Sequence, residues 1–300
     1  MEIVLNGSTR RLSSFVRAAC LGGVLWGLSA CGPLPEESAD ASLSTHAGGL
    51  ASQGGLSLNG LSLNGLSNAT FSSWFEGHPA LNQEVMKYVV RCAVPAGQTR
   101  TYTSAQTGQG WTWAGGLGLA PDWSAGASAS LTEQQLVSAC LAAHANKFGV
   151  SIALSIQGRT ATNGLIATSA SELQAYPERE GCFFGNVFNG EGLFVGNDAK
   201  ALNHKKSTAR ACALAIKKSG APECAPMIRV EPDCSDLCTR EATGGAYATC
   251  THNGVTYPAL TTRLRAEDIY TCGDGVCQVS ESCGTGDSYD NCQADCGRCS

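Results

Sequence analysis

Charged residues are scarce in this chain of 300 residues. Asp, Glu, Lys and Arg make up 15% of it, against roughly 25% in an ordinary soluble domain. Acidic residues outnumber basic ones by 25 to 20, which gives a formal net charge of −5. A mildly acidic surface repels phosphate backbones, so the composition argues against a nucleic-acid-binding protein.

The chain also lacks an apolar run of the roughly 20 residues that a membrane-spanning helix needs. The apolar stretch near the N-terminus, residues 18–30, has 13 residues and follows Arg10, Arg11 and Arg17. A basic segment followed by a short apolar one is typical of a signal peptide. We therefore expect residues 1–30 to be absent from the mature protein.

The end of this apolar stretch carries the motif Leu28-Ser29-Ala30-Cys31. The motif resembles the lipobox of bacterial lipoproteins. The resemblance implies cleavage before Cys31, a diacylglyceryl group on its thiol and an acylated amine, and more than one acyl chain gives lasting membrane attachment. The expected location is the cell envelope, at the outer membrane, on its periplasmic or outer side. The alternative is ordinary cleavage near Ala30, which would leave Cys31 as a plain thiol.

Motifs of the common enzyme classes are missing. The sequence has no P-loop, no Gly-x-Ser-x-Gly, no His-Glu-x-x-His and no Gly-x-Gly-x-x-Gly after an expected strand. Cys140 and His144 lie one helical turn apart, and Gln134 precedes Cys140 by six residues, a spacing similar to that of papain-like enzymes. A catalytic thiol is usually activated at a helix N-terminus or by a cation, whereas Cys140 is expected well inside a helix. A disulfide to Cys92 or another cysteine is therefore the preferred interpretation, and no catalytic residue or organic cofactor is identified.

Residues 31–70 lack a sustained helical or strand period and are rich in Gly, Ser, Ala and Leu. They are expected to form a flexible tether with a reach of roughly 35 Å. The tether contains a short repeat, Gly-Leu-Ser-Leu-Asn, over residues 55–67. The repeat has fewer than the roughly three units that a stacked solenoid needs, so we interpret it as linker whose leucines dock on a neighbouring surface.

Residues 71–222 are expected to form a mixed domain. Helical spacing of apolar residues predicts helices over 81–92, 132–147 and 207–220, and alternation predicts a strand over 150–158. A hairpin is expected from residues 183–188 and 193–195. The irregular interleaving of helices and strands favours an α+β fold over a regular βαβ array.

Two local features of this domain predict a helix start and the position of its tryptophans. Thr132 and Gln135 stand at capping-box spacing where the second helix should begin. Trp111 and Trp113 would share one face of a strand, with Trp123 nearby. If these indoles were exposed to solvent, they would form a platform for a glycan or peptide. Packing in the core is the preferred interpretation.

Cysteine is present in excess, with 16 residues, of which ten follow residue 223. Cys20 leaves with the signal peptide and Cys31 takes the lipid, so fourteen cysteines remain for disulfides in an oxidising compartment. These are Cys92, Cys140, Cys182, Cys212, Cys224, Cys234, Cys238, Cys250, Cys272, Cys277, Cys283, Cys292, Cys296 and Cys299. Residues 223–300 are therefore expected to form a small, loop-dominated, disulfide-rich module. The alternative is zinc on Cys292, Cys296 and Cys299 with Cys272 or Cys277.

The same module carries five acidic residues that could supply oxygen ligands to calcium. They are Asp274, Glu281, Asp287, Asp290 and Asp295. Residues 272–299 resemble the cysteine-rich repeats of many bacterial secreted proteins and, more distantly, the Lin-12/Notch repeats, which calcium stabilises. The resemblance implies a calcium site, whereas a solvated acidic loop is the default interpretation of these residues.

The body of the chain resembles uncharacterised secreted proteins of myxobacterial type in residues 91–97, 137–141 and 185–188. Taken with the lipobox, this predicts a lipid-anchored envelope protein with a binding or structural role. Its expected partners are the membrane, through its lipid, and a glycan or protein ligand. The alternative is a secreted, lipid-anchored hydrolase whose catalytic set the sequence does not identify.

Overall fold

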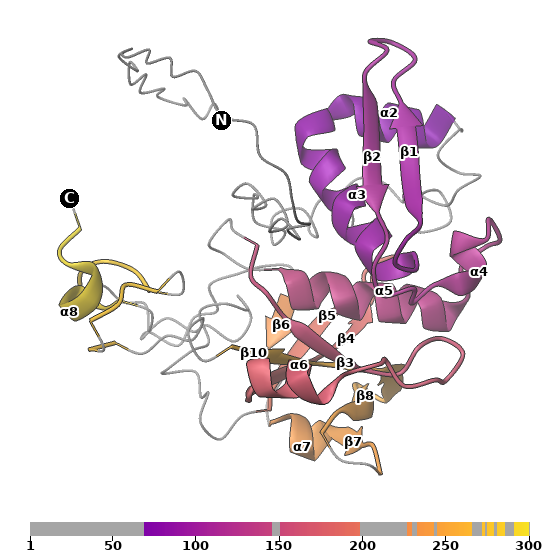
Figure 1. Ribbon diagram of the computed structural model, residues 1–300. Coiled ribbons are helices and arrows are strands. Elements are labelled where there is room, and N and C mark those ends of the chain that lie inside the picture. The colour runs from indigo at the N-terminus through magenta and orange to yellow at the C-terminus, as the bar shows by residue number, and fades with distance from the viewer. Residues whose placement is uncertain are drawn as a thin grey trace, which may run out of the picture. The chain divides into compact units, whose positions relative to one another are not determined.

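The computed structural model describes residues 69–145, 151–198, 227–229, 233–242, 245–265, 272–273, 275–278, 281–285 and 291–299 (Figure 1). These ranges form helices and mainly antiparallel sheets, which confirms the predicted α+β class. Several predicted features lie outside the described residues, among them the signal segment with Cys31, the tether repeat and the helix at 207–220.

Two helices and a hairpin open the described chain. α2 (Ala69–Gly77) is followed by α3 (Pro79–Ala93). α3 has proline in its first turn, where a missing N–H removes no helical hydrogen bond, and it contains the predicted helix. β1 (Thr99–Thr103) and β2 (Gly110–Ala114) pair antiparallel as a two-stranded sheet.

One carboxylate fixes the start of the two helices that follow, α4 (Pro121–Ser124) and α5 (Leu131–His144). The N–H of Ser130 donates to Glu133 at 2.8 Å, and the N–H of Glu133 donates to the Ser130 hydroxyl at 3.2 Å. The second oxygen of Glu133 accepts the N–H of Asp122 at 2.7 Å, in the first turn of α4. The predicted capping box at Thr132 was wrong by two residues, because α5 begins earlier than its apolar pattern suggests.

The larger sheet has the strand order β3-β10-β4-β5-β6 and is antiparallel except between β5 and β6. The bounds of its strands are β3 (Ser155–Gly158), β4 (Glu178–Asn186), β5 (Gly192–Asn197), β6 (Met227–Arg229) and β10 (Leu260–Leu264). The β4–β5 pair is the predicted hairpin. The strand predicted over 150–158 is shorter, because β10 pairs only with its last four residues.

The position of β10 changes the predicted organisation of the chain. β10 comes from the cysteine-rich part, yet it lies between β3 and β4 in the larger sheet. The disulfide between Cys182 and Cys234 joins the same two parts. The larger sheet therefore contains strands from both sides of the boundary predicted between residues 222 and 223.

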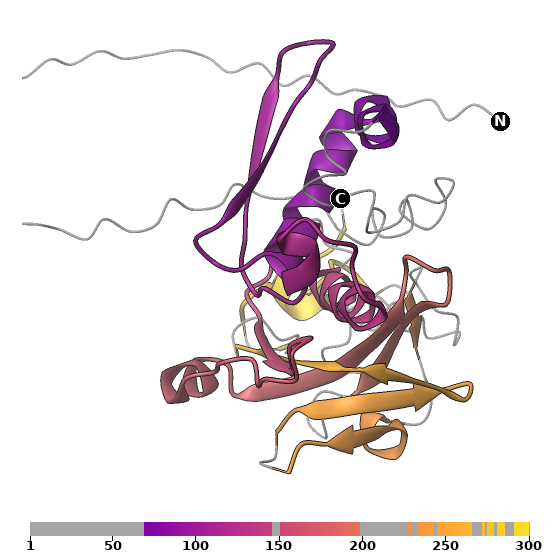
Figure 2. The same cartoon turned by 90° about the vertical axis from the view of Figure 1, so that its right-hand side faces the viewer.

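The larger sheet has a different partner on each face. Phe183 and Phe184 are neighbours in β4 and point to opposite faces, as successive strand residues do. Phe183 packs in the main core with α3 and α5, whereas Phe184 packs in a second cluster with Tyr247 and Tyr257. These tyrosines belong to a three-stranded sheet, β7 (Cys238–Arg240), β8 (Tyr247–His252) and β9 (Val255–Pro258) (Figure 2).

The remaining helices are short: α6 (Ala170–Ala175), α7 (Cys234–Leu237) and α8 (Gln293–Cys296). Six disulfides join cysteines of the described residues, which confirms that this is a disulfide-bonded protein. They are Cys92–Cys140, Cys182–Cys234, Cys238–Cys250, Cys272–Cys292, Cys277–Cys296 and Cys283–Cys299. The last three use the sulfurs that the zinc alternative required. Cys212 and Cys224 lie outside the described residues.

Candidate binding site

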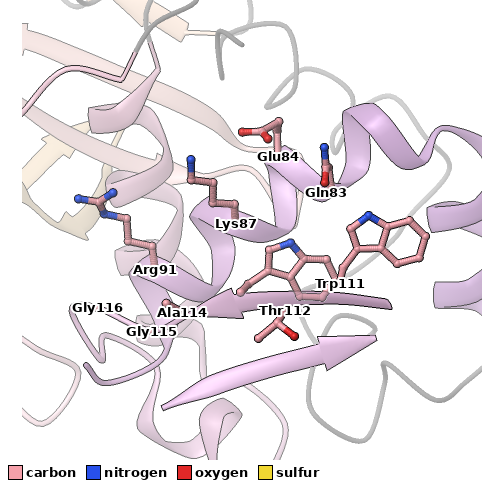
Figure 3. A pocket seen from close by; sticks show the side chains of 10 residues that line it. Gln83, Glu84, Lys87, Arg91, Trp111, Thr112, Ala114, Gly115 and Gly116 are labelled. Atoms are coloured by element: carbon pink, nitrogen blue, oxygen red, sulfur yellow. The ribbon is translucent and has the colours of Figure 1, made fainter. Parts of the chain in front are cut away.

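A groove of about 480 Å³ runs between α3 and β2 (Figure 3). We call it the α3–β2 groove. It is lined by residues of one helix face, one strand and the glycines after that strand. These are Gln83, Glu84, Lys87, Arg91, Trp111, Thr112, Trp113, Ala114, Gly115 and Gly116.

The helix side of the groove is a polar stripe. Gln83, Lys87 and Arg91 are four residues apart, so they lie above one another on one face of α3. Buried residues such as Val85 and Val89 occupy the face toward the core. The stripe was present in the sequence as polar residues at helical spacing, but nothing there indicated that a strand would form an opposing wall.

The strand side of the groove carries the two neighbouring tryptophans. Both indoles lie on one face of β2, as alternation predicts. Trp113 is 5% exposed and belongs to the main core, where Trp123 is fully buried. Trp111 is half-buried, with its ring centroid 4.8 Å from that of Phe75 and 6.0 Å from that of Tyr102. Core packing thus holds for Trp113 and Trp123, and Trp111 is the indole at the rim of the groove.

Glycines close one end of the groove. The N–H of Leu117 donates to the carbonyl of Arg91 at 2.8 Å, and the N–H of Gly116 donates to that of Val94 at 2.7 Å. These bonds satisfy carbonyls at the end of α3 that have no helical partner. A Cβ atom on Gly116 would lie 2.7 Å from the Arg91 carbonyl oxygen, so glycine is needed for this approach. The glycine-rich segment therefore holds the Arg91 end of α3 against β2.

The charges along the groove favour a ligand with an anionic group. Lys87 and Arg91 face it with two positive charges and Glu84 with one negative charge. In Figure 3 the Arg91 side chain lies beside Gly115 and Gly116, and Gln83 lies toward Trp111. The groove therefore offers an aromatic ring at one end and a guanidinium at the other, with the Lys87 ammonium between them.

The sulfur of Cys140 is bonded to that of Cys92. A bridged sulfur has no thiolate and cannot act as a nucleophile. His144 packs its ring 5.1 Å from that of Tyr88, and the Gln134 side chain donates to the carbonyl of Ala129. The papain-like spacing in the sequence therefore corresponds to a structural disulfide between α3 and α5.

The calcium candidates are only partly within the described residues. Asp295 accepts the N–H groups of Gly273 and Gly275, and Glu281 accepts that of Gln278. Both carboxylates thus hold loop backbone in place. Asp274, Asp287 and Asp290 lie outside the described residues. The described part of the chain brings no three acidic side chains within reach of one ion.

A second cavity, of about 310 Å³, lies beside β3. Its one charged lining residue is Glu241, whose two oxygens accept bonds from Arg159, both at 2.6 Å. The Arg159 guanidinium lowers the pKa of Glu241. The α3–β2 groove is the larger of these two cavities and combines aromatic with charged lining residues, so it is the stronger candidate site.

Comparisons with protein-family models, with curated proteins and with solved structures found no match to this chain. Within the residues that the structure describes, no helix is long and apolar enough to cross a membrane. The geometry of the α3–β2 groove is therefore the main support for a function.

Proposed function

We propose that this protein is a lipid-anchored binding protein of the bacterial cell envelope that holds a ligand in the α3–β2 groove. The anchor is the lipid on Cys31, and residues 31–70 are the tether that separates it from the folded body. The lipobox and the short apolar segment before it support this location.

The observation that carries the binding role is the position of Trp111. A half-buried indole with two core rings behind it is held rigidly, which reduces the entropy lost when a ligand packs on it. Opposite it, Gln83 and Lys87 supply hydrogen-bond donors from a helix that a disulfide fixes to α5. Aromatic anchors beside a few fixed polar groups are typical of ligand sites.

Mass spectrometry of the mature N-terminus tests the anchor. We expect a terminal Cys31 whose mass includes a diacylglyceryl group and an amide-linked acyl chain. An unmodified terminus at Ala30 or Cys31 would contradict the anchor and leave the groove without its proposed location.

Glycan and peptide arrays probed with the mature protein test the binding role. We expect selective retention that falls at least tenfold for Trp111→Ala, because a buried aromatic anchor contributes about 1.4 kcal/mol or more. Leu165→Ala is the matched control, since Leu165 is a large apolar side chain that is 53% exposed outside the groove. Circular dichroism checks that both variants fold. Equal retention by Trp111→Ala and the parent protein would contradict the site.

A further inference from the structure

The hydrogen bonds of the β1–β2 hairpin show which backbone groups are directed outward. The N–H of Gly115 donates to the carbonyl of Gln98 at 2.8 Å, and that of Ser104 donates to Gln109 at 2.8 Å. In an antiparallel pair, residues alternate between bonded and non-bonded positions. In this register Trp111 and Trp113 therefore bond across to β1, and Thr112 stands opposite Thr101 in a non-bonded pair.

Non-bonded positions direct their N–H and C=O groups away from the partner strand. In β2 these positions are Gly110, Thr112 and Ala114, all of them exposed. No other strand of the described residues pairs with β2. β2 therefore has a free edge with a donor and an acceptor at every second residue.

The free edge of β2 borders the α3–β2 groove. β2 lies between β1 and α3, and both contact it (Figure 1). Thr112 and Ala114, whose backbone groups point to this edge, both line the groove (Figure 3). The floor of the groove is therefore an unpaired strand edge, and its opposite wall is the stripe of Gln83, Lys87 and Arg91.

We propose that the ligand of the α3–β2 groove is an extended acidic peptide that adds to β2 as a third strand. This inference rests on the proposed binding function and names the class of ligand. Strand addition supplies backbone hydrogen bonds at each second residue, and side chains in flanking pockets give selectivity. A peptide matches the repeat of about 6.8 Å between outward groups of a strand, which a sugar chain does not reproduce.

The helix wall defines the side chains that such a peptide needs. Alternate residues of an added strand point toward the same side, so every second side chain would face α3. Lys87 and Arg91 lie there, one helical turn apart, and their two positive charges exceed the single negative charge of Glu84, so this wall favours carboxylates. Trp111 at the other end of the groove favours an apolar or aromatic side chain. The ligand is therefore a strand with acidic residues at alternate positions near one end.

The outer edge of β1 provides an internal control. Thr101 is exposed, its backbone groups point away from β2, and it does not line the groove. Proline in place of a threonine removes an outward N–H without breaking a ladder bond of the hairpin. Thr112→Pro and Thr101→Pro thus make the same chemical change on opposite edges of one hairpin.

The test is binding of the mature protein to short synthetic peptides with Glu, Gln or Lys at alternate positions, measured by fluorescence anisotropy. We expect Glu peptides to bind best and Thr112→Pro to weaken them about tenfold, because it removes a backbone hydrogen bond to the ligand. Thr101→Pro should bind as the parent protein does. Lys87→Gln and Arg91→Gln should each weaken binding roughly fivefold, and Arg298→Gln, in the C-terminal loops, should not.

A second measurement does not depend on the proline variants folding. N-methylation of the peptide at one amide after another removes its donors singly, and strand addition requires loss of binding at every second position. Uniform loss along the peptide, or equal affinity of the Glu, Gln and Lys peptides, would overturn the inference. Selective retention of a glycan in place of the peptides would also overturn it but would leave the proposed binding function standing. Binding to neither class would reject both.

Discussion

Cys92 of α3 and Cys140 of α5 are joined by a disulfide whose Cα atoms lie 6.0 Å apart. Both cysteines are fully buried among the apolar residues that the two helices share. The bond fixes the helix that forms one wall of the α3–β2 groove to the helix that covers the larger sheet. It therefore couples the candidate site to the core of the protein.

Removing this disulfide should destabilise the protein without abolishing the groove. The bond closes a loop with a sequence separation of 48 residues, for which the loss of chain entropy corresponds to about 4 kcal/mol. We expect Cys92→Ala with Cys140→Ala to lower the free energy of unfolding by about 2–4 kcal/mol in guanidinium chloride. The double variant leaves no unpaired thiol. A change below about 1 kcal/mol would contradict a structural role for the bond.

The capping box of α5 predicts different losses of stability for substitutions at neighbouring residues. Ser130→Ala should cost about 1 kcal/mol, because it removes the acceptor for the N–H of Glu133. Glu133→Ala should cost more, since the carboxylate accepts bonds at the starts of both α4 and α5. Denaturation midpoints measure both changes. Thr132→Ala is the control, and a loss there equal to that of Ser130→Ala would restore the capping box expected from the sequence.

Gly196 in β5 lies against the Cys182–Cys234 disulfide. A Cβ atom on Gly196 would lie 2.9 Å from the sulfur atoms of both cysteines, which is inside the van der Waals contact distance. We expect Gly196→Ala to destabilise the protein by about 1–3 kcal/mol through overpacking. Gly77→Ala is the control, because nothing lies within 4 Å of a Cβ atom at that position. Equal unfolding midpoints for the two variants would contradict this packing.

Tyr247 should titrate at a higher pH than a tyrosine in the unfolded chain. Burial and its 2.9 Å hydrogen bond to Asp198 raise the pKa of Tyr247 to about 12. Because the pKa is raised relative to about 10 in the unfolded chain, the neutral phenol stabilises the fold fully below pH 10. That contribution is lost as the pH rises from about 10 toward 12.

Ultraviolet absorbance during alkaline titration measures this effect. We expect Tyr247→Phe to remove a tyrosine transition near pH 12 and to reduce the loss of stability between about pH 10 and 12. Tyr176→Phe, which also removes one phenol and lies directly after α6, is the control. Disappearance of an early transition in the Tyr247 variant would contradict the assignment.

Local sequence signals predicted much of the fold. α3, α5 and the β4–β5 hairpin follow from apolar periodicity and turn residues, which depend on neighbours within a few positions. The presence of disulfides follows from the number of cysteines and an expected oxidising compartment. Trp111 and Trp113 were expected on one strand face, because side chains alternate in any strand.

The tertiary structure determined features of the fold that no local sequence pattern could predict. β10 lies between β3 and β4 because of pairings between residues about eighty or more positions apart in sequence. The same long-range contacts bury Trp113 and leave Trp111 at the rim, although both lie on one face of one strand. The groove itself exists only where α3 meets the free edge of β2. The sequence alone determined α3, most of α5, the β4–β5 hairpin and the presence of disulfides, because these depend on local patterns and on cysteine number, whereas packing between distant segments determined which residues line the groove.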